Sequence, residues 1–81
     1  MKVAVKLFAA ARQLAASDEA VVELPADATV AELRVALAAA HPALAPLLRH
    51  ALFAIDAEYA TDATCIPADA EVACIPPVSG G

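Results

Sequence analysis

The sequence predicts one α+β domain, a mixed sheet with helices packed on one face. The first eight residues alternate apolar and polar side chains, as a strand covered on one side does. A capped amphipathic helix begins after Thr29, and two strand-like runs follow in the last third of the chain. With 81 residues, the chain has room for one core and no second domain.

The first quarter of the chain predicts a strand, a helix and a second strand. In residues 1–8, three aliphatic side chains share one face and two lysines the other. Residues 9–17 are rich in strong helix formers and end at a polar Ser-Asp pair. Residues 19–25 then read as a short strand closed by Pro25. The two strands could pair across this connection, although a helical link also permits other arrangements.

The clearest local signal is a helix over residues 30–40. Thr29 and Glu32 have the spacing of a capping box, in which each side chain accepts a hydrogen bond from the other residue's backbone. Large apolar residues then recur at i, i+3 and i+7, which predicts a buried stripe. We expect His41 at the carboxyl end of the helix, because the following Pro42 disfavours further helix.

The last third of the chain predicts further strands. Residues 52–56 and 71–75 are strand-like, and the segment between them is expected to hold one short strand and turns. Asp56 and Glu58 are two residues apart on a probable strand, so their carboxylates would share a face. We interpret them as a solvated strand end rather than an acid–base pair.

Composition excludes several classes of protein. The net charge is −5 and the five basic residues are scattered, so no basic stripe exists for nucleic acid. The most apolar stretch, residues 35–48, is rich in alanine and is broken by two prolines, so we expect no membrane span. The amino-terminal residues do not have the pattern of a secretory leader. We therefore expect a cytoplasmic protein.

The cysteines predict neither a metal site nor a catalytic thiol. Cys65 and Cys74 form no CxxC pair, and His41 and His50 do not stand at a zinc-like spacing with them. Both cysteines lie in apolar, strand-like stretches, so we expect reduced and mostly buried thiols. A disulfide between neighbouring strands and a catalytic thiol are the alternatives, but no basic residue stands nearby to lower a thiol pKa.

The carboxyl terminus differs from the rest of the chain. Gly80 and Gly81 are the only glycines, so glycine-rich phosphate and nucleophile motifs are absent from the sequence. Two residues without side chains can enter a channel where a Cβ would clash. A terminal carboxylate is unreactive until it is activated, for example as a mixed anhydride with AMP. The sequence therefore suits a carrier whose terminal carboxyl is used inside another protein's site.

The residues before the glycines lead the chain away from the domain. Pro76 and Pro77 cannot donate to a strand ladder, so the last strand should end there and the chain leave stiffly. Val78 supplies an apolar side chain and Ser79 a small polar one. We expect a folded domain over residues 1–77 and a flexible tail over residues 78–81.

Two motifs give the chain a resemblance to a known family. Residues 6–14, KLFAAARQL, fit the pattern LFA-x-x-R-x-L, and the chain ends in PPVSGG. Over essentially its whole length it resembles the small subunits of molybdopterin synthase, the MoaD-like sulfur carriers of the ubiquitin-like superfamily. It departs from many relatives at Asp56, where they have Asn, and at Ala70, where they have Gly.

The resemblance implies a ubiquitin-like β-grasp fold and a defined chemistry at Gly81. An ATP-using, ubiquitin-activating-like adenylyltransferase would adenylate the Gly81 carboxylate, and sulfur would then replace AMP to give a thiocarboxylate. Val78, Ser79 and Gly80 would enter a channel of the large synthase subunit, where sulfur passes to cyclic pyranopterin monophosphate to form the molybdopterin dithiolene. Acid–base residues would belong to the large subunit, so this chain would be a sulfur donor that binds no cofactor and no metal.

The resemblance also implies a docking surface and a mixed dimer of dimers. We expect the edge that bears the tail to present apolar residues to its partners. The candidates are Pro76, Pro77, Phe8 and Phe53.

Two other functions stay open. One is the sulfur carrier of thiamine thiazole synthesis, whose members typically lack the Phe-Ala-x-x-Arg opening and the Pro-Pro pair. The other is a ubiquitin-like protein modifier that conjugates Gly81 to lysines.

Overall fold

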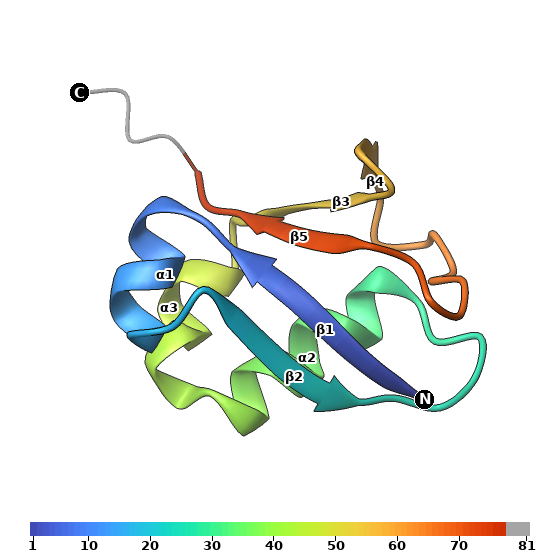
Figure 1. Cartoon of the computed structure of the whole chain (residues 1–81), viewed down its shortest axis with the longest axis horizontal. Coiled ribbons are helices and arrows are strands. Elements are labelled where there is room, and N and C mark those ends of the chain that lie inside the picture. The colour runs from blue at the N-terminus through green and yellow to red at the C-terminus, as the bar shows by residue number, and fades with distance from the viewer. Residues whose placement is uncertain (78–81) are drawn as a thin grey trace.

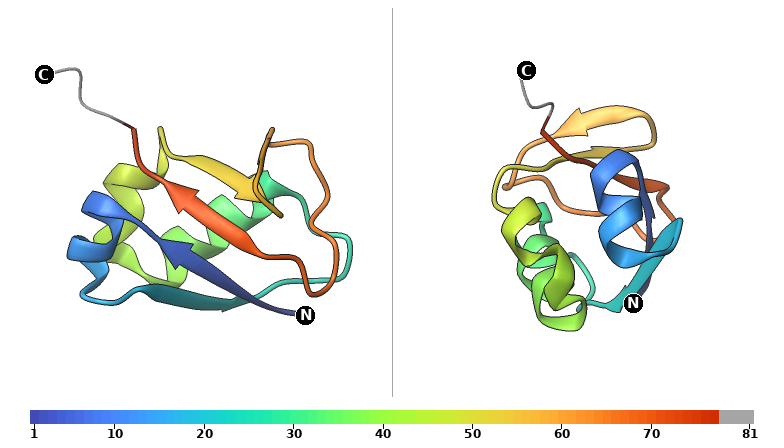
Figure 2. Two further views of the ribbon diagram at one scale, coloured as in Figure 1. Left: turned by 45° about the horizontal axis from the view of Figure 1, so that its top comes forward. Right: turned by 90° about the vertical axis from the view of Figure 1, so that its left-hand side faces the viewer.

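A computed structural model describes residues 1–77 of the chain, and the predicted α+β class is confirmed (Figure 1). Its helices lie on one face of a five-stranded mixed sheet with the strand order β2-β1-β5-β3-β4 (Figure 2). The elements, in chain order, are β1 (Lys2–Leu7), α1 (Ala9–Ala15), β2 (Glu19–Glu23), α2 (Val30–Ala40), the 3-10 helix η1 (Pro42–Leu44), α3 (Ala45–Leu48), β3 (Leu52–Ile55), β4 (Glu58–Ala60) and β5 (Val72–Ile75).

The sheet places the first and the last strand of the chain side by side. β1 and β2 pair antiparallel, with Lys2 opposite Glu23, which confirms the first of the arrangements that the sequence permitted. β5 pairs with β1 in parallel, with Val5 opposite Val72, and with β3 antiparallel. The last strand of the chain therefore lies in the middle of the sheet.

The core lies between the sheet and the helices. The aliphatic face of β1 is buried, and the α2 stripe of Val30, Leu33 and Leu37 is buried completely. The capping box of α2 forms as predicted: the N–H of Glu32 donates to Thr29 Oγ1 (3.3 Å), and the N–H of Thr29 donates to Glu32 Oε1 (3.1 Å). Such a cap contributes about 1 kcal/mol.

The two short helices after α2 were missed in the sequence. α2 ends as expected, with His41 as its C-cap. Pro42 and Pro46 then stand in the first turns of η1 and α3, where a missing N–H costs no helical hydrogen bond. Each short helix buries one leucine, Leu44 or Leu48, against the core.

Turns that would normally use glycine use alanine and aspartate instead. Within residues 1–77, six non-glycine residues have a positive φ: Ala9, Ala16, Asp27, Asp56, Ala57 and Asp69. Asp56 and Ala57 (φ 49° and 69°) form the two-residue hairpin loop between β3 and β4, as in a type I′ turn. The expectation that Asp56 and Glu58 share one strand face is therefore wrong, because Asp56 lies in the turn itself and Glu58 begins the next strand.

In the turn before β5 this chain has Ala70, where many relatives have Gly. Positive φ falls on Asp69 (62°) rather than on Ala70. Aspartate tolerates this region better than alanine does, so the missing glycine costs less there than Ala70 would suggest.

In residues 1–77, no single helix has both the length and the apolar character to cross a membrane. Val30–Ala40 and Pro42–Leu48 meet that test of length and composition only when they are joined, and they are bent by 117° at the break between them.

Candidate functional site

The central strand β5 determines where the end of the chain leaves the sheet. Because β5 runs parallel to β1, its carboxyl end lies beside the end of β1 (Figure 1). Cys74 pairs with Leu7 there. On its other side, Ile75 lies opposite Leu52, the first residue of β3. The structure describes the chain as far as Pro77. The predicted tail residues Val78, Ser79, Gly80 and Gly81 lie outside the described residues.

Apolar side chains surround this exit on the sheet face opposite the helices. Cys74 is buried toward the helices, so alternation places the half-buried Ile75 on the other face. Leu52, which pairs with Ile75 from the neighbouring strand β3, is 53% exposed. Phe8 follows β1, the strand on the other side of β5, and is 48% exposed. We call Phe8, Leu52 and Ile75 the exit patch. Exposed apolar groups that gather in this way are typical of a docking surface.

Two of the predicted docking residues are placed differently. Phe53 is 0% exposed and belongs to the core, so its assignment to the docking surface is wrong. The strand Leu52–Ile55 is apolar throughout, so its sequence does not tell which side chains face outward. Pro76 is also buried, whereas Pro77 and Phe8 are exposed as docking would require.

A hollow of about 380 Å³ continues the exit patch along the open face of the sheet. Its polar side is held in place by contacts among three residues. Lys6 Nζ lies 3.1 Å from Glu71 Oε1, and the N–H of Glu71 donates to Asp56 Oδ1 (3.0 Å). The N–H of Asp56 donates in turn to the carbonyl of Glu71 (2.8 Å). An apolar centre with a charged rim is the usual composition of a protein–protein interface.

The cysteines differ in exposure, and neither forms a disulfide within the described residues. Cys74 is buried as predicted, and this burial raises the pKa of its thiol from the ordinary 9.0 to about 11, although the Arg34 charge acts in the opposite direction. Cys65 is exposed, so its predicted burial is wrong. It makes one isolated bridge with Thr29, the N-cap of α2, outside the named strands. The Cys74 thiol is poorly suited to act as a nucleophile, because the thiolate is the reactive form.

Residues 1–77 contain no group of three or more His, Cys, Asp or Glu side chains placed to hold a metal ion. The candidate site is the exit patch, with the adjoining hollow, at the end of β5.

Known proteins match the whole chain. A curated protein of Chlamydomonas reinhardtii named molybdopterin synthase sulfur carrier subunit is 37% identical over 83 residues, with 100% of each chain covered. A crystal structure of SAMP1, the small archaeal modifier protein 1 of Haloferax volcanii, is 34% identical, covers 100% of both chains and has a TM-score of 0.85. A chain from a complex of subunits 1 and 2 of molybdopterin-converting factor from Helicobacter pylori has the same fold, with a TM-score of 0.68, 20% identity and 100% of both chains covered.

These neighbours confirm the ubiquitin-like β-grasp fold that the sequence implied. The ThiS family model matches residues 5–81, which include the second half of β1, all later strands and helices and the terminal Gly-Gly. The chain therefore belongs to the ThiS family.

Proposed function

We propose that this chain is the sulfur-carrier subunit of a molybdopterin synthase and that it carries sulfur on Gly81. The observation that supports this most is the match along its full length to relatives of that name, at 37% identity. The fold agrees with the role, because the central strand β5 ends beside an exposed apolar patch.

The chemistry takes place at the terminal carboxyl group. The Gly81 carboxylate attacks the α-phosphate of ATP on an adenylyltransferase, and pyrophosphate leaves. A sulfur nucleophile then displaces AMP to give the thiocarboxylate, whose sulfur adds to the pyranopterin precursor. As this C–S bond forms, an oxygen substituent leaves the precursor carbon, so that a thioester joins carrier and precursor. Water then cleaves the bond between the Gly81 carbonyl carbon and the sulfur, which leaves the sulfur on the precursor and regenerates the carboxylate. Two such transfers supply the two sulfurs of the dithiolene. This chain supplies the sulfur, and the acid–base groups belong to the partner.

The large subunit docks on the exit patch and the adjoining hollow in this proposal. Phe8 and Leu52 lie on either side of Ile75, and Pro77 continues from the strand they flank. The Helicobacter pylori chain of the same fold was solved in complex with subunit 2 of its converting factor, which offers a precedent for such a pair. We further propose a mixed dimer of dimers and a cytoplasmic location.

Shortening the tail tests this function. Deletion of Gly81 moves the carboxyl group inward by about 3.5 Å, and a misplacement of about 1 Å can cost 100-fold in a positioned reaction. Gly80→Val tests the same channel by adding a side chain, and Ser79→Ala is the matched control because it adds no bulk. With purified adenylyltransferase, sulfide and large subunit, we expect molybdopterin formation from Ser79→Ala and almost none from the other two variants.

All three variants should melt at the wild-type temperature, since the changes lie outside residues 1–77, which contain every described strand and helix. Formation of molybdopterin at the wild-type rate by the Gly81 deletion would contradict the proposed function.

A protein modifier is the second candidate function, because SAMP1 of Haloferax volcanii is 34% identical over the whole chain. Incubating the chain with lysate of its own host and ATP separates the two roles. Adducts of higher mass with Gly81 joined to lysines would support conjugation. A mass gain of about 16 Da on the free chain, from exchange of oxygen for sulfur, would support the carrier.

The remaining candidate function is the sulfur carrier of thiamine thiazole synthesis. Carriers of that pathway typically lack the motif of Phe8, Ala9 and Arg12 and the Pro-Pro pair, so these residues favour the molybdopterin pathway. Sulfur transfer to a purified thiazole synthase, without transfer to the pyranopterin precursor, would reverse this choice.

A further inference from the structure

β2 is an edge strand with main-chain groups free to pair. In the sheet formed by residues 1–77 it has one neighbour, β1. Met1 and Leu24 form a hydrogen-bonded pair, because the N–H of each donates to the C=O of the other. Hydrogen-bonded and non-hydrogen-bonded pairs alternate along an antiparallel ladder, so every second pair of residues between β1 and β2 is bonded in this way. The N–H and C=O groups of Val21 and Glu23 fall on the alternate positions and point toward the free edge. The N–H and C=O groups of Glu19 also point toward the free edge, but both are hydrogen-bonded to the Ser17 hydroxyl.

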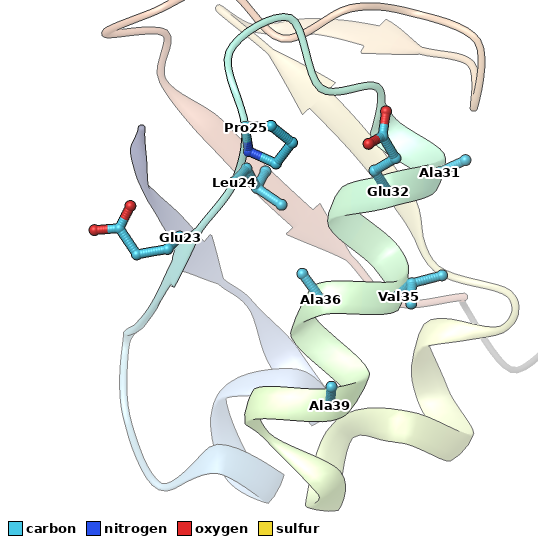
Figure 3. Close-up of a pocket in the computed structure, with 8 residues that line it drawn as sticks. All are labelled: Glu23, Leu24, Pro25, Ala31, Glu32, Val35, Ala36 and Ala39. Carbon is cyan, nitrogen blue, oxygen red and sulfur yellow. The ribbon is translucent and has the colours of Figure 1, made fainter.

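An apolar groove of about 490 Å³ lies beside the same edge, between the end of β2 and α2 (Figure 3). Leu24 and Pro25 line it on the strand side, and Ala36 and Ala39 line it on the helix side. Val35, 71% exposed, is the largest apolar side chain that α2 contributes to it, and Glu32 adds a carboxylate. The groove lies near the start of β1, because Glu23 pairs with Lys2, whereas the exit patch lies at the end of β1.

A strand that paired with β2 would fill this groove with every second side chain. Residues of the added strand that stand opposite Val22 would point as Val22 does, toward the helices. Their neighbours would point to the open face, directly opposite Glu19 and Glu23, both of which are exposed. Opposite charges at such cross-strand positions stabilise a pair, and like charges destabilise it.

The same charges oppose a second copy of this chain as the occupant. If two β2 strands paired antiparallel about Val21, Glu19 of each would face Glu23 of the other. This arrangement would also join two chains that each have a net charge of −5. Acidic side chains on a free edge are a common device against self-pairing.

We propose that the β2 edge and the β2–α2 groove bind an extended segment of a partner protein, with basic residues alternating with apolar ones. The segment adds a sixth strand beside β2, places its apolar side chains in the groove and its basic side chains over Glu19 and Glu23. This is β-strand addition, in which main-chain bonds give affinity and alternate side chains give specificity. The inference does not depend on the proposed sulfur chemistry, since the exit patch lies elsewhere.

The test uses the 81-residue chain and a synthetic peptide, acetyl-Lys-Val-Lys-Val-Lys-Val-Lys-amide. In ¹H–¹⁵N spectra we expect saturable shifts centred on β2 and α2. We also expect amide exchange at Val21 and Glu23 to become at least about tenfold slower, because both amides gain a partner. A twin peptide with Glu in place of Lys, and a third that is N-methylated on its paired amides, should bind at least about tenfold more weakly.

Variants of the protein test the same two contacts. Val21→Pro removes an N–H that β1 does not use and should weaken binding at least about tenfold, whereas Val21→Thr keeps the N–H and should bind as the wild type does. Glu19→Lys with Glu23→Lys should weaken binding to a similar degree. Glu58→Lys with Tyr59→Lys and Ala68→Lys changes the net charge equally at exposed positions outside β2 and is the matched control. Should Val21→Pro fail to fold, the N-methylated peptide still tests the main-chain pairing on the wild-type protein.

Several outcomes would overturn the proposal. Shifts centred on the exit patch, equal binding of the Lys and Glu peptides, or undiminished binding of the N-methylated peptide would each do so. Concentration-dependent shifts at β2 without peptide would instead assign the edge to a second copy of the chain.

Discussion

The guanidinium carbon of Arg34 lies 5.0 Å from the centroid of the Phe53 ring. The same guanidinium donates to the main-chain carbonyls of Leu48 and Ala51, the latter at 2.7 Å, and to Asp62 Oδ1 at 2.8 Å. One side chain of α2 therefore holds the end of α3, the residue before β3 and the loop after β4. Phe53 lies beneath this cation, which explains why it is unavailable for docking.

Replacing Arg34 tests this network. Arg34→Met keeps the length of the side chain but removes the donors, so we expect the free energy of unfolding to fall by about 2–3 kcal/mol. The exposed ion pair with Asp62 adds little to this figure. Urea denaturation measures it, with Arg49→Met as the control at an exposed position, where a change within about 0.5 kcal/mol is expected. An equal effect at both sites would contradict the assigned role.

The hairpin loop offers a stabilising change. Ala57 has φ 69°, a region that costs alanine about 1 kcal/mol and glycine almost nothing. We therefore expect Ala57→Gly to raise the free energy of unfolding by up to about 1 kcal/mol. Ala10→Gly, in the exposed part of α1, should lower it by about 1 kcal/mol. Thermal melts of both variants provide the comparison, and destabilisation by both would contradict the type I′ geometry.

Burial of Cys74 makes stability depend on alkaline pH. Its thiol has a pKa of about 11 in the folded chain and of about 9.0 once it is exposed by unfolding. The unfolded state therefore loses this proton first, so the free energy of unfolding should fall as the pH rises from 9 to 11. Cys74→Ala should show a shallower decline over the same range. If denaturation curves gave equal slopes for the two proteins, the thiol would not be the group responsible.

The exit patch predicts a selective loss of partner binding. Leu52→Lys places a charge where the large subunit should bury an apolar side chain, and we expect binding to weaken by about 10- to 100-fold. Val35→Lys makes the same change at another exposed apolar residue, on α2, and should leave this binding unaltered. Calorimetry with purified large subunit measures both. If Val35→Lys were the damaging change, the docking surface would lie on the helical side.

Much of the domain could be predicted from local patterns. The alternation in β1, the Thr29–Glu32 capping box and the stripe on α2 each produce the expected element, because each is buried on one side only. The order of the strands in the sheet could not be predicted from such local patterns. That β5 lies between β1 and β3 follows from pairing between segments far apart in the chain, which no local pattern encodes.

The errors have local physical causes. Pro42 and Pro46 suggest breaks, but a proline also begins a helix well, and the sequence alone does not separate the two roles. The apolar run of β3 conceals which of Leu52 and Phe53 faces outward. The hairpin after β3 was not predicted, since its loop lacks the glycine that usually marks such a turn.

The central position of β5 also has a mechanical consequence. Met1 precedes β1 at one end of the sheet, and Pro77 follows β5 at the other, while the two strands run parallel. A force that pulls these two ends apart therefore acts along the strands and strains their hydrogen bonds together, instead of opening them one after another. A partner protein that draws the carboxyl end into its own structure would thus be pulling against a sheet arranged to resist shear.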